Sequence, residues 1–431
     1  MSYQNFVQLQ ESSAMQLREI VKLLKTLAGR KIITFSHDDP DGITSAAIFK
    51  RLTDKLGIKN KIYLPGQFVL SKKELKDALD KDSSIEAVFV LDKGTIEGYN
   101  SYIDIVKNFV VIDHHPPIGK NFSNILVFNP SVKEYTQCSC SLLLNVLYNL
   151  FYNSDREIDL ITLIGLKADW GIDTLNNIIP PFVRPFYEEK IISAFSFLLE
   201  PRRNLEPTIF EISNREITNL LNHLAQLFFA VSGGGFQYFY NEYDEKLKDV
   251  FQPELCLEIL LEKLETNKFD SIDDFIKNLK EKEKVRLIYS YFLKDIENTS
   301  KLFDTNTFIG KTVNGVDVYL FFGKGVRLMP MVGSVKLYEY AKGKESAIIM
   351  VNRELNGGTH LSFRANTDII HLGKLANDIA KSLVEKYGFA SEISGGGHPR
   401  AAEMKAQNGV VSFVDVMKIF FDFLSEIVNV K

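Results

Sequence analysis

Cysteine is scarce in this chain, and its scarcity limits the kinds of protein that the sequence can encode. The 431 residues include three cysteines, Cys138, Cys140 and Cys256, which are too few for a disulfide framework. Cys138 and Cys140 also lack the two-residue gap of a zinc-binding or redox-active pair. We therefore expect a protein that works in a reducing compartment, and we assign it to the cytoplasm.

Long apolar runs and a large net charge are missing as well. No stretch approaches the roughly 20 uninterrupted apolar residues of a membrane span, and the first residues lack the basic and apolar regions of an export signal. We expect no membrane association. The 51 basic and 55 acidic side chains give a formal net charge of −4, so that any contact with nucleic acid must come from a local patch.

The chain contains enough apolar sequence for a substantial core. Hydrophobic residues make up 45% of it, and its length predicts two or three domains at roughly 100–200 residues each. From residue 31 to residue 168, short β-rich runs alternate with helical segments, and runs such as 88–91 and 110–112 are apolar on both faces. This pattern predicts the α/β class, with a doubly wound parallel sheet in a domain spanning residues 1–178.

Prolines at 180, 181 and 185 interrupt this alternation. Residues 179–302 then follow as helical segments rich in lysine and glutamate, which we interpret as a helical connector. Beyond it, four β-rich runs between residues 307 and 364, and two helical runs at 374–386 and 414–427, predict a second, smaller α/β domain over residues 303–431.

Acidic and imidazole side chains follow three of the predicted strands of the first domain. His37, Asp39 and Asp41 come after the run 31–36, Asp92 after 87–91, Asp113, His114 and His115 after 109–112, and Asp169 ends a helical run at 160–168. Because the carboxyl ends of parallel strands meet at one edge of a sheet, we expect these groups to converge.

So many carboxylates in one place would repel each other unless cations neutralised them. Oxygen ligands with a few imidazoles suit Mn²⁺ or Mg²⁺, and the set is large enough for two ions that share an aspartate, roughly 3.5–4 Å apart. Zinc is disfavoured because no cysteine is suitably placed. A structural alternative stays open, in which Asp39 and Asp41 cap a helix and Asp92 is a turn residue.

Two glycine triplets also stand out. Gly395–Gly397 precede His398, and such glycines let backbone amides approach a phosphate closely. Gly233–Gly235 have no histidine after them, and we interpret them as a turn or helix end. Lysines and an arginine between residues 323 and 344, interleaved with aromatic residues, either contact nucleic acid or form a solvated helix face.

On these motifs, the sequence resembles the DHH phosphoesterase superfamily. That superfamily is named for a triplet that is present here as Asp113-His114-His115. The C-terminal part resembles its companion DHHA1 domain, whose GGGH signature is Gly395–His398. The resemblance implies that two manganese ions, or magnesium as an alternative, are bound by His37, Asp39, Asp41, Asp92, His114 and Asp169. Asp92 would bridge the ions and Asp113 would orient His114.

The same resemblance implies the roles of the remaining groups. His115 would contact the scissile phosphate and, with Asp92 and Asp113, form the catalytic set. Arg364, Gly395, Gly396, Gly397 and His398 would hold the substrate phosphate. For Arg364, a solvated charge at a strand end is the structural alternative.

Within the superfamily, the Ser-His-x-Asp-x-Asp-Gly form of the first motif and the long connector favour the RecJ-like exonucleases of archaeal type. The expected activity is hydrolysis of single-stranded DNA or RNA from one end, with water activated by two metal ions. Two alternatives stay open. One is a phosphodiesterase acting on short oligoribonucleotides or cyclic dinucleotides. The other is a replication or repair scaffold with residual nuclease activity, which would bind a protein partner through the helical connector.

Overall fold

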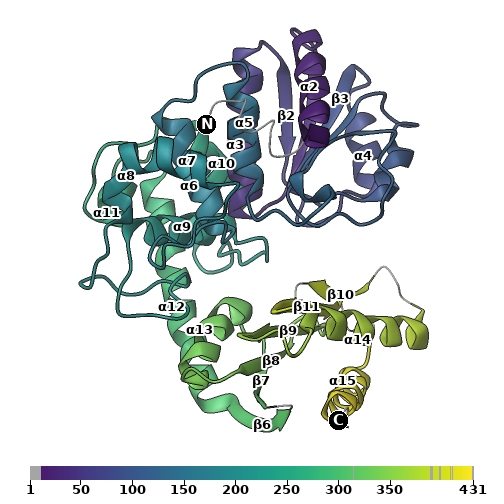
Figure 1. Cartoon of the computed structure of the whole chain (residues 1–431), viewed down its shortest axis with the longest axis vertical. Coiled ribbons are helices and arrows are strands. Elements are labelled where there is room, and N and C mark those ends of the chain that lie inside the picture. Colours follow the sequence, from purple (N-terminus) through teal and green to yellow (C-terminus); the bar gives the residue numbers. More distant parts are fainter. Residues whose placement is uncertain are drawn as a thin grey trace. The chain divides into compact units, whose positions relative to one another are not determined.

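The computed structural model of the chain describes residues 11–313, 315–388, 392–397, 399–407, 409 and 411–429, which form two compact units (Figure 1). The first unit runs to Thr208 and also takes Ile217–Tyr289. The second consists of Ile209–Glu216 and everything from Ser290 onwards. Most of the segment that we expected to be a connector therefore packs with the first unit.

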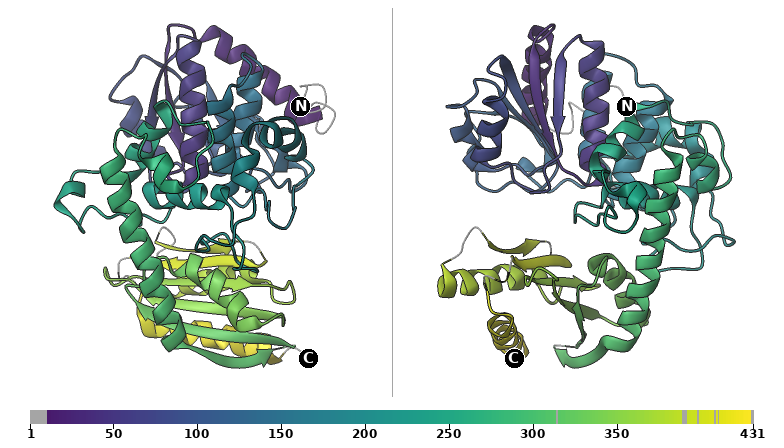
Figure 2. Two further views of the ribbon diagram at one scale, coloured as in Figure 1. Left: turned by 90° about the vertical axis from the view of Figure 1, so that its left-hand side faces the viewer. Right: turned by 180° about the vertical axis from the view of Figure 1, so that it is seen from behind.

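The first unit is built on a parallel sheet with the strand order β2-β1-β3-β4-β5 (Figure 2). Its strands are β1 (Lys31–Ser36), β2 (Lys59–Tyr63), β3 (Ile85–Leu91), β4 (Phe109–Ile112) and β5 (Leu126–Phe128). Every pairing is parallel. The predicted doubly wound parallel sheet is thus confirmed.

Helices cover both faces of this sheet. On one face lie α3 (Pro40–Lys55) and α5 (Cys140–Asn149), with α6 (Arg156–Ala168) packed against both; the other carries α4 (Lys72–Leu79) and the 3-10 turn η1 (Glu97–Tyr102). Within β3, Phe89 packs on Phe49 of α3 at 4.7 Å between ring centroids, whereas its neighbour Val88 packs with Leu75 of α4. Alternate side chains therefore fill two cores, which is why the strand is apolar throughout.

The remaining helices of this unit gather beside α3 and α6. They are α7 (Arg184–Phe186), α8 (Ile192–Leu199), α9 (Leu220–Ser232), α10 (Gln252–Leu261) and α11 (Ile272–Ile276), while α2 (Glu11–Thr26) lies against β5. The long helix α12 (Lys282–Asn306) begins in this unit and continues into the second. Of all the helices in the described residues, none is both long and apolar enough to span a bilayer.

The second unit has a six-stranded sheet with the order β10-β11-β9-β8-β7-β6. Its strands are β6 (Thr307–Val313), β7 (Val316–Lys324), β8 (Ser346–Arg353), β9 (Thr359–Ala365), β10 (Ile393–Gly397) and β11 (Ala401–Ala406). Only β7 and β8 pair in parallel within this described sheet. A second α/β fold is confirmed here.

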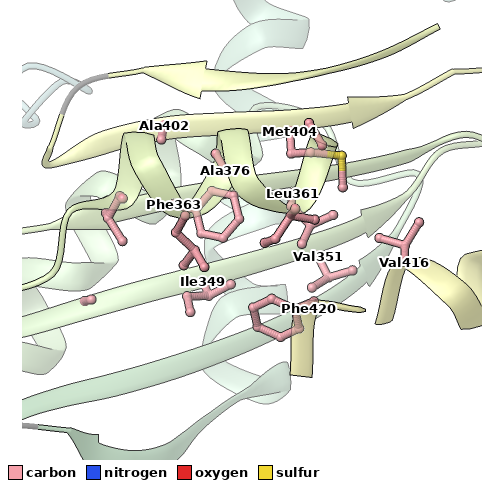
Figure 3. Packing of buried hydrophobic residues seen from close by; sticks show 14 of the residues in the cluster. Ile349, Val351, Leu361, Phe363, Ala376, Ala402, Met404, Val416 and Phe420 are labelled. Carbon is pink, nitrogen blue, oxygen red and sulfur yellow. The ribbon is translucent and has the colours of Figure 1, made fainter. Parts of the chain in front are cut away.

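One face of this second sheet holds the core of the unit. Side chains such as Ile349, Leu361 and Phe363 pack against α14 (Leu372–Tyr387) and α15 (Phe413–Asn429), as Figure 3 shows. The opposite face carries α13 (Met329–Ala341), where Gly333 lies against Met350. β10 and β11 were not predicted from the sequence, and a helix at the position of α13 was only one of two interpretations of residues 323–344.

The glycines at 395–397 lie in an edge strand, whereas we expected a loop. Gly395, Gly396 and Gly397 pair with Met404, Glu403 and Ala402 of β11. A Cβ atom on Gly395 would collide with the carbonyl oxygen of Ala376. Gly395 therefore lets α14 pack closely on this strand, and glycine is rare enough in strands that the triplet did not indicate one.

Candidate metal centre

The centre lies at the carboxyl ends of β1, β3 and β4, which are neighbours in the first sheet. β1 and β3 flank the point where the strand order reverses, the usual ligand position in open α/β sheets. After β1, Asp39 caps α3 by accepting a 2.8 Å hydrogen bond from the Gly42 amide, while its other oxygen lies 2.9 Å from His37 Nδ1. The capping interpretation is correct, and it does not exclude a second role.

Asp41 lies in the first turn of α3 and points at the N-terminus of α5. Its carboxylate accepts hydrogen bonds from the backbone amides of Cys140 at 2.6 Å and Ser141 at 3.0 Å. A Cβ atom on Gly165 would come within 2.8 Å of Asp41 Oδ1. Glycine in α6 therefore makes room for three helices to meet at this carboxylate.

Asp92 is buried directly after β3 in the left-handed backbone region, with φ at +56°. Aspartate tolerates this region better than most residues, although it still costs energy. Its Oδ1 lies 3.3 Å from His114 Nε2, and its Oδ2 lies 3.9 Å from His37 Nδ1. Asp92 thus stands between the groups that follow β1 and β4.

All six predicted metal ligands come together. His37, Asp39 and Asp92 form one group whose ligand atoms lie within 4.8 Å of one another, and Asp41, His114 and Asp169 form a second. Asp169, at the C-terminal end of α6, lies 3.3 Å from His114 Nε2. Because Asp92 also approaches His114, one aspartate connects the two groups.

The carboxylate of Asp113 holds His115. Asp113 Oδ1 lies 2.8 Å from His115 Nδ1, and its Oδ2 accepts hydrogen bonds from Thr95 Oγ1 and Asn129 Nδ2. We expected Asp113 to orient His114 instead. Side chains two positions apart in an extended segment point the same way, which brings His115 to Asp113.

Burial and mutual repulsion shift the pKa values of several acidic side chains in the centre. Burial, reinforced by the charge of Asp39, raises the pKa of Asp41 to about 6. Burial and neighbouring carboxylates also raise the pKa values of Asp92 and Asp169 well above the usual range. Burial would lower the pKa of His115, but Asp113 raises it to about 9. The protein alone therefore disfavours having all of these carboxylates ionised together.

These residues fit a pair of hard divalent cations. Asp92 Oδ1 is buried and accepts no hydrogen bond from the described residues, so that it retains a lone pair for a cation. Carboxylate and imidazole ligands suit Mn²⁺ or Mg²⁺. The nearby Cys140 thiol donates to the carbonyl of Ile112 at 3.2 Å, and burial raises its pKa far above its usual value. A thiolate site for zinc does not fit.

Gly235 contributes to the centre from a distant part of the chain. α9 ends at Gly233, and Gly233, Gly234 and Gly235 all have positive φ angles, as a helix end requires. A Cβ atom on Gly235 would lie 2.9 Å from Asp39 Cβ and 3.3 Å from His37 Cε1. The triplet that we interpreted as a helix end is one, but it also forms a wall of the centre.

Two further residues of the centre, Phe68 and Lys93, were not predicted from the sequence. The Phe68 ring lies edge-on to both His37 and His115, with centroid distances of 5.4 and 4.9 Å. Its loop is fastened by the buried Lys93, whose Nζ donates to the carbonyls of Pro65 and Gln67. Burial lowers the pKa of Lys93 to about 8. A lysine directly after Asp92 was the available indication.

In the second unit, Arg364 is mostly buried rather than solvated. Its guanidinium donates to Ser362 Oγ at 3.0 Å and lies 3.5 Å from Glu403 Oε1. Burial would raise the pKa of Glu403, but His360, 3.1 Å away, and Arg364 lower it to about 2. Gly396 pairs with Glu403, so that Arg364 and the glycine strand adjoin. His398 lies outside the described residues.

Three of the five basic side chains in the segment 323–344 lie within 4.0 Å of a carboxylate, Lys344 at 3.9 Å from Asp317. Lys336 pairs with Asp304 at 2.7 Å and Glu339 at 2.8 Å, and Arg327 pairs with Asp295 at 2.7 Å. Of its aromatic companions, Phe321 is buried against Phe303. The structural alternative describes this segment better than a nucleic-acid patch does.

Comparison with known proteins identifies the first unit. Residues 31–166 match the DHH family, N-terminal domain, so this part of the chain is similar to that family's domain. No curated protein sequence matches the chain. The family match ends before Asp169 and before the glycine wall.

Solved structures resemble the chain over nearly its whole length. RecJ from Thermus thermophilus in complex with Mn²⁺ is 16% identical with a TM-score of 0.58; the match covers 95% of this chain and 55% of that one. An exonuclease RecJ bound to manganese is 16% identical with a TM-score of 0.54, covering 96% and 93%. CDC45 from Entamoeba histolytica is 11% identical with a TM-score of 0.51, covering 95% and 99%.

At such identities the likeness establishes the fold. The chain spans little more than half the length of the Thermus RecJ structure. The RecJ-like DHH fold is therefore a finding, and what this chain hydrolyses is a proposal.

Proposed function

We propose that the protein is a manganese-dependent phosphodiesterase that hydrolyses single-stranded nucleic acid from an end, as a RecJ-like exonuclease. The observation that carries this proposal is the position of Asp92, which belongs to one three-residue group and lies 3.3 Å from His114 of the other. Divalent cations held there would supply a nucleophilic water and neutralise charge on the phosphate. His37, Asp39 and Asp92 would hold one ion, and Asp41, His114 and Asp169 the other, with Asp92 shared.

His115 is the candidate for substrate contact. Its Nδ1 is taken by Asp113, which leaves Nε2 to donate to a phosphate oxygen or to the leaving oxygen. Thr95 and Asn129 fix Asp113 in turn. Because the imidazole is oriented before substrate arrives, little ordering is needed when a phosphate binds.

We propose that residues 303–431, which belong to the second unit, act as a DHHA1-type substrate-binding domain. Arg364 would hold a non-reacting phosphate together with the strand Gly395–Gly397 and His398. Glu403 already holds the guanidinium in place, so that a phosphate would compete with a carboxylate for it. Arg364 would therefore position the substrate phosphate rather than contribute strongly to substrate affinity.

The test is a product analysis with end-labelled DNA, RNA and dinucleotide substrates. We expect activity with Mn²⁺, loss of activity in chelator, and a ladder that shortens from one end of single strands. A duplex about 20 Å wide must unpair before one phosphate reaches a recessed centre, so blunt duplex should be a poor substrate. Full activity in chelator would refute the metal centre, and cleavage of dinucleotides alone would refute the exonuclease assignment.

A further inference from the structure

A cavity of about 580 Å³ lies in the first unit, between residues 134–137 and 178–182. Buried Ile179, Pro180 and Phe182 line its interior, and the exposed side chains of Tyr135 and Ile178 line its mouth. The segment that contains the two consecutive prolines, which we interpreted only as a break between domains, thus forms one side of a pocket. Its volume falls within the range of small-molecule sites.

This pocket adjoins the metal centre. The side-chain amide of Gln137, on the pocket wall, donates a 3.1 Å hydrogen bond to the backbone carbonyl of Trp170. Trp170 directly follows Asp169, and its φ of +57° marks a sharp change of chain direction there. Burial, and then the charge of Asp169, raise the pKa of the Tyr135 phenol. The pocket therefore adjoins the centre at Trp170 and Asp169.

The wall opposite Tyr135 is fixed by hydrogen bonds. Asp173 and Ile178 exchange two backbone hydrogen bonds, at 3.0 and 2.8 Å. The Asp173 carboxylate accepts hydrogen bonds from the amides of Leu175 and Asn176 inside that loop. Asn219, beside α9, donates to Thr174 at 2.9 Å. Ile178 is consequently held outwards at the mouth of the pocket.

The side chains that line the pocket show which kind of ligand it can bind, a phosphate group or an uncharged planar ring. Tyr135, Ile178 and Phe182 offer an aromatic and apolar surface, and Thr136 and Gln137 offer hydrogen-bonding groups. The lining residues that the structure describes include the carboxylate of Glu134 and no lysine or arginine. A phosphate would meet repulsion there. An uncharged planar ring with polar edges finds both stacking and hydrogen-bond partners.

We propose that this pocket binds the nucleobase of the nucleotide whose phosphate lies at the metal centre, with Tyr135 as the stacking residue. The inference rests on the proposed function and extends it, since it assigns base recognition to residues 134–137 and 178–182 of the first unit. Gln137 and Thr136 line the same pocket, and a base edge would compete for their donors with the backbone carbonyls that they already contact.

Trp170 provides the assay, because it is the chain's single tryptophan and is 43% exposed beside the pocket. AMP and ribose 5-phosphate are titrated against the full chain in Mg²⁺ buffer while tryptophan emission is recorded. Both ligands carry the phosphate, but only AMP carries a base. We expect AMP to change the emission and to bind about tenfold more tightly than ribose 5-phosphate, at the lower end of a base–aromatic stack.

Substitutions test whether AMP binds at the pocket beside Tyr135. Tyr135→Ala should weaken AMP binding about tenfold and leave ribose 5-phosphate unchanged, while Tyr135→Phe should retain AMP affinity because the ring is kept. Tyr243→Ala is the matched control, since Tyr243 is an exposed tyrosine that does not line the pocket. Equal affinity for both ligands, or an unchanged AMP affinity in Tyr135→Ala, would overturn the proposal. AMP binding that depends on Tyr135 in a protein without nuclease activity would support the pocket and reject the proposed hydrolysis.

Discussion

Substitution of Gly235 by alanine tests whether the wall formed after α9 matters to the metal centre. Two effects are expected from this single methyl group. The φ of +70° is costly for any residue with a Cβ atom, and this cost amounts to about 1–2 kcal/mol of folding stability. The new Cβ atom would also lie 2.9 Å from Asp39 Cβ and 3.3 Å from His37 Cε1, so that these side chains must shift.

Gly57 separates the two effects. Its φ is +69°, and a Cβ atom placed there would have no neighbour within 4 Å. Gly57→Ala therefore carries the backbone cost without touching the centre. Both variants should lose about 1–2 kcal/mol in denaturant unfolding of the metal-free protein. Only Gly235→Ala should also weaken Mn²⁺ binding, by about 10–100-fold, the range seen when the residues supporting metal ligands are disturbed.

Calorimetric titration with Mn²⁺ provides the measurement, and the unfolding curves provide the reference for overall damage. A Gly235→Ala protein that binds Mn²⁺ as tightly as Gly57→Ala would refute the reasoning. It would mean that Asp39 and His37 can move aside without loss, and that the glycine serves the helix end alone.

Three further predictions concern individual side chains. Asp92→Ala should abolish turnover and lower the bound manganese, measured by elemental analysis, because the aspartate belongs to one ligand group and lies 3.3 Å from His114 of the other; unchanged turnover would place the centre elsewhere. Arg364→Ala should weaken binding of a labelled single strand while the manganese content stays constant, and a loss of manganese would contradict a phosphate-binding role. Glu403 has a pKa of about 2, below its ordinary 4.5, so its ionised form stabilises the fold above about pH 4.5 and this contribution, at most about 3 kcal/mol, is lost as the pH falls towards 2. Glu403→Gln should therefore be less stable at about pH 7 and less sensitive to acid than the parent, as unfolding curves at about pH 7 and about pH 3 would reveal.

The sequence predicted the first sheet and the convergence of its polar groups because both depend on local patterns. Apolar runs such as Phe109–Ile112 form strands wherever helices cover both faces, and the residues after them meet at one edge. Asn129, which follows β5 and binds Asp113, could have been found by the same rule. The rule needs only the order of strands and the residue after each.

Contacts between segments that are distant in the sequence could not be predicted from local patterns. Nothing near Gly235 in the sequence indicates that it will lie against Asp39. The two interpretations of the basic segment 323–344 could not be separated for the same reason, since Asp295 and Asp304, which neutralise Arg327 and Lys336, belong to α12. Charge counted within a short window omits partners that the fold brings from elsewhere.

The division of the chain between its two units affects how the first unit can form during synthesis. The match to the DHH family ends at residue 166, but the unit that contains it is complete only at Tyr289, 123 residues later. At roughly 5–20 residues per second, a ribosome needs on the order of ten seconds to cover that distance. α9 and α10, which cover α6 and α3, are both made within this interval, and before they are made the apolar faces of the growing chain stay open to chaperones. A fragment cut where the family match ends would remain permanently in that unfinished state.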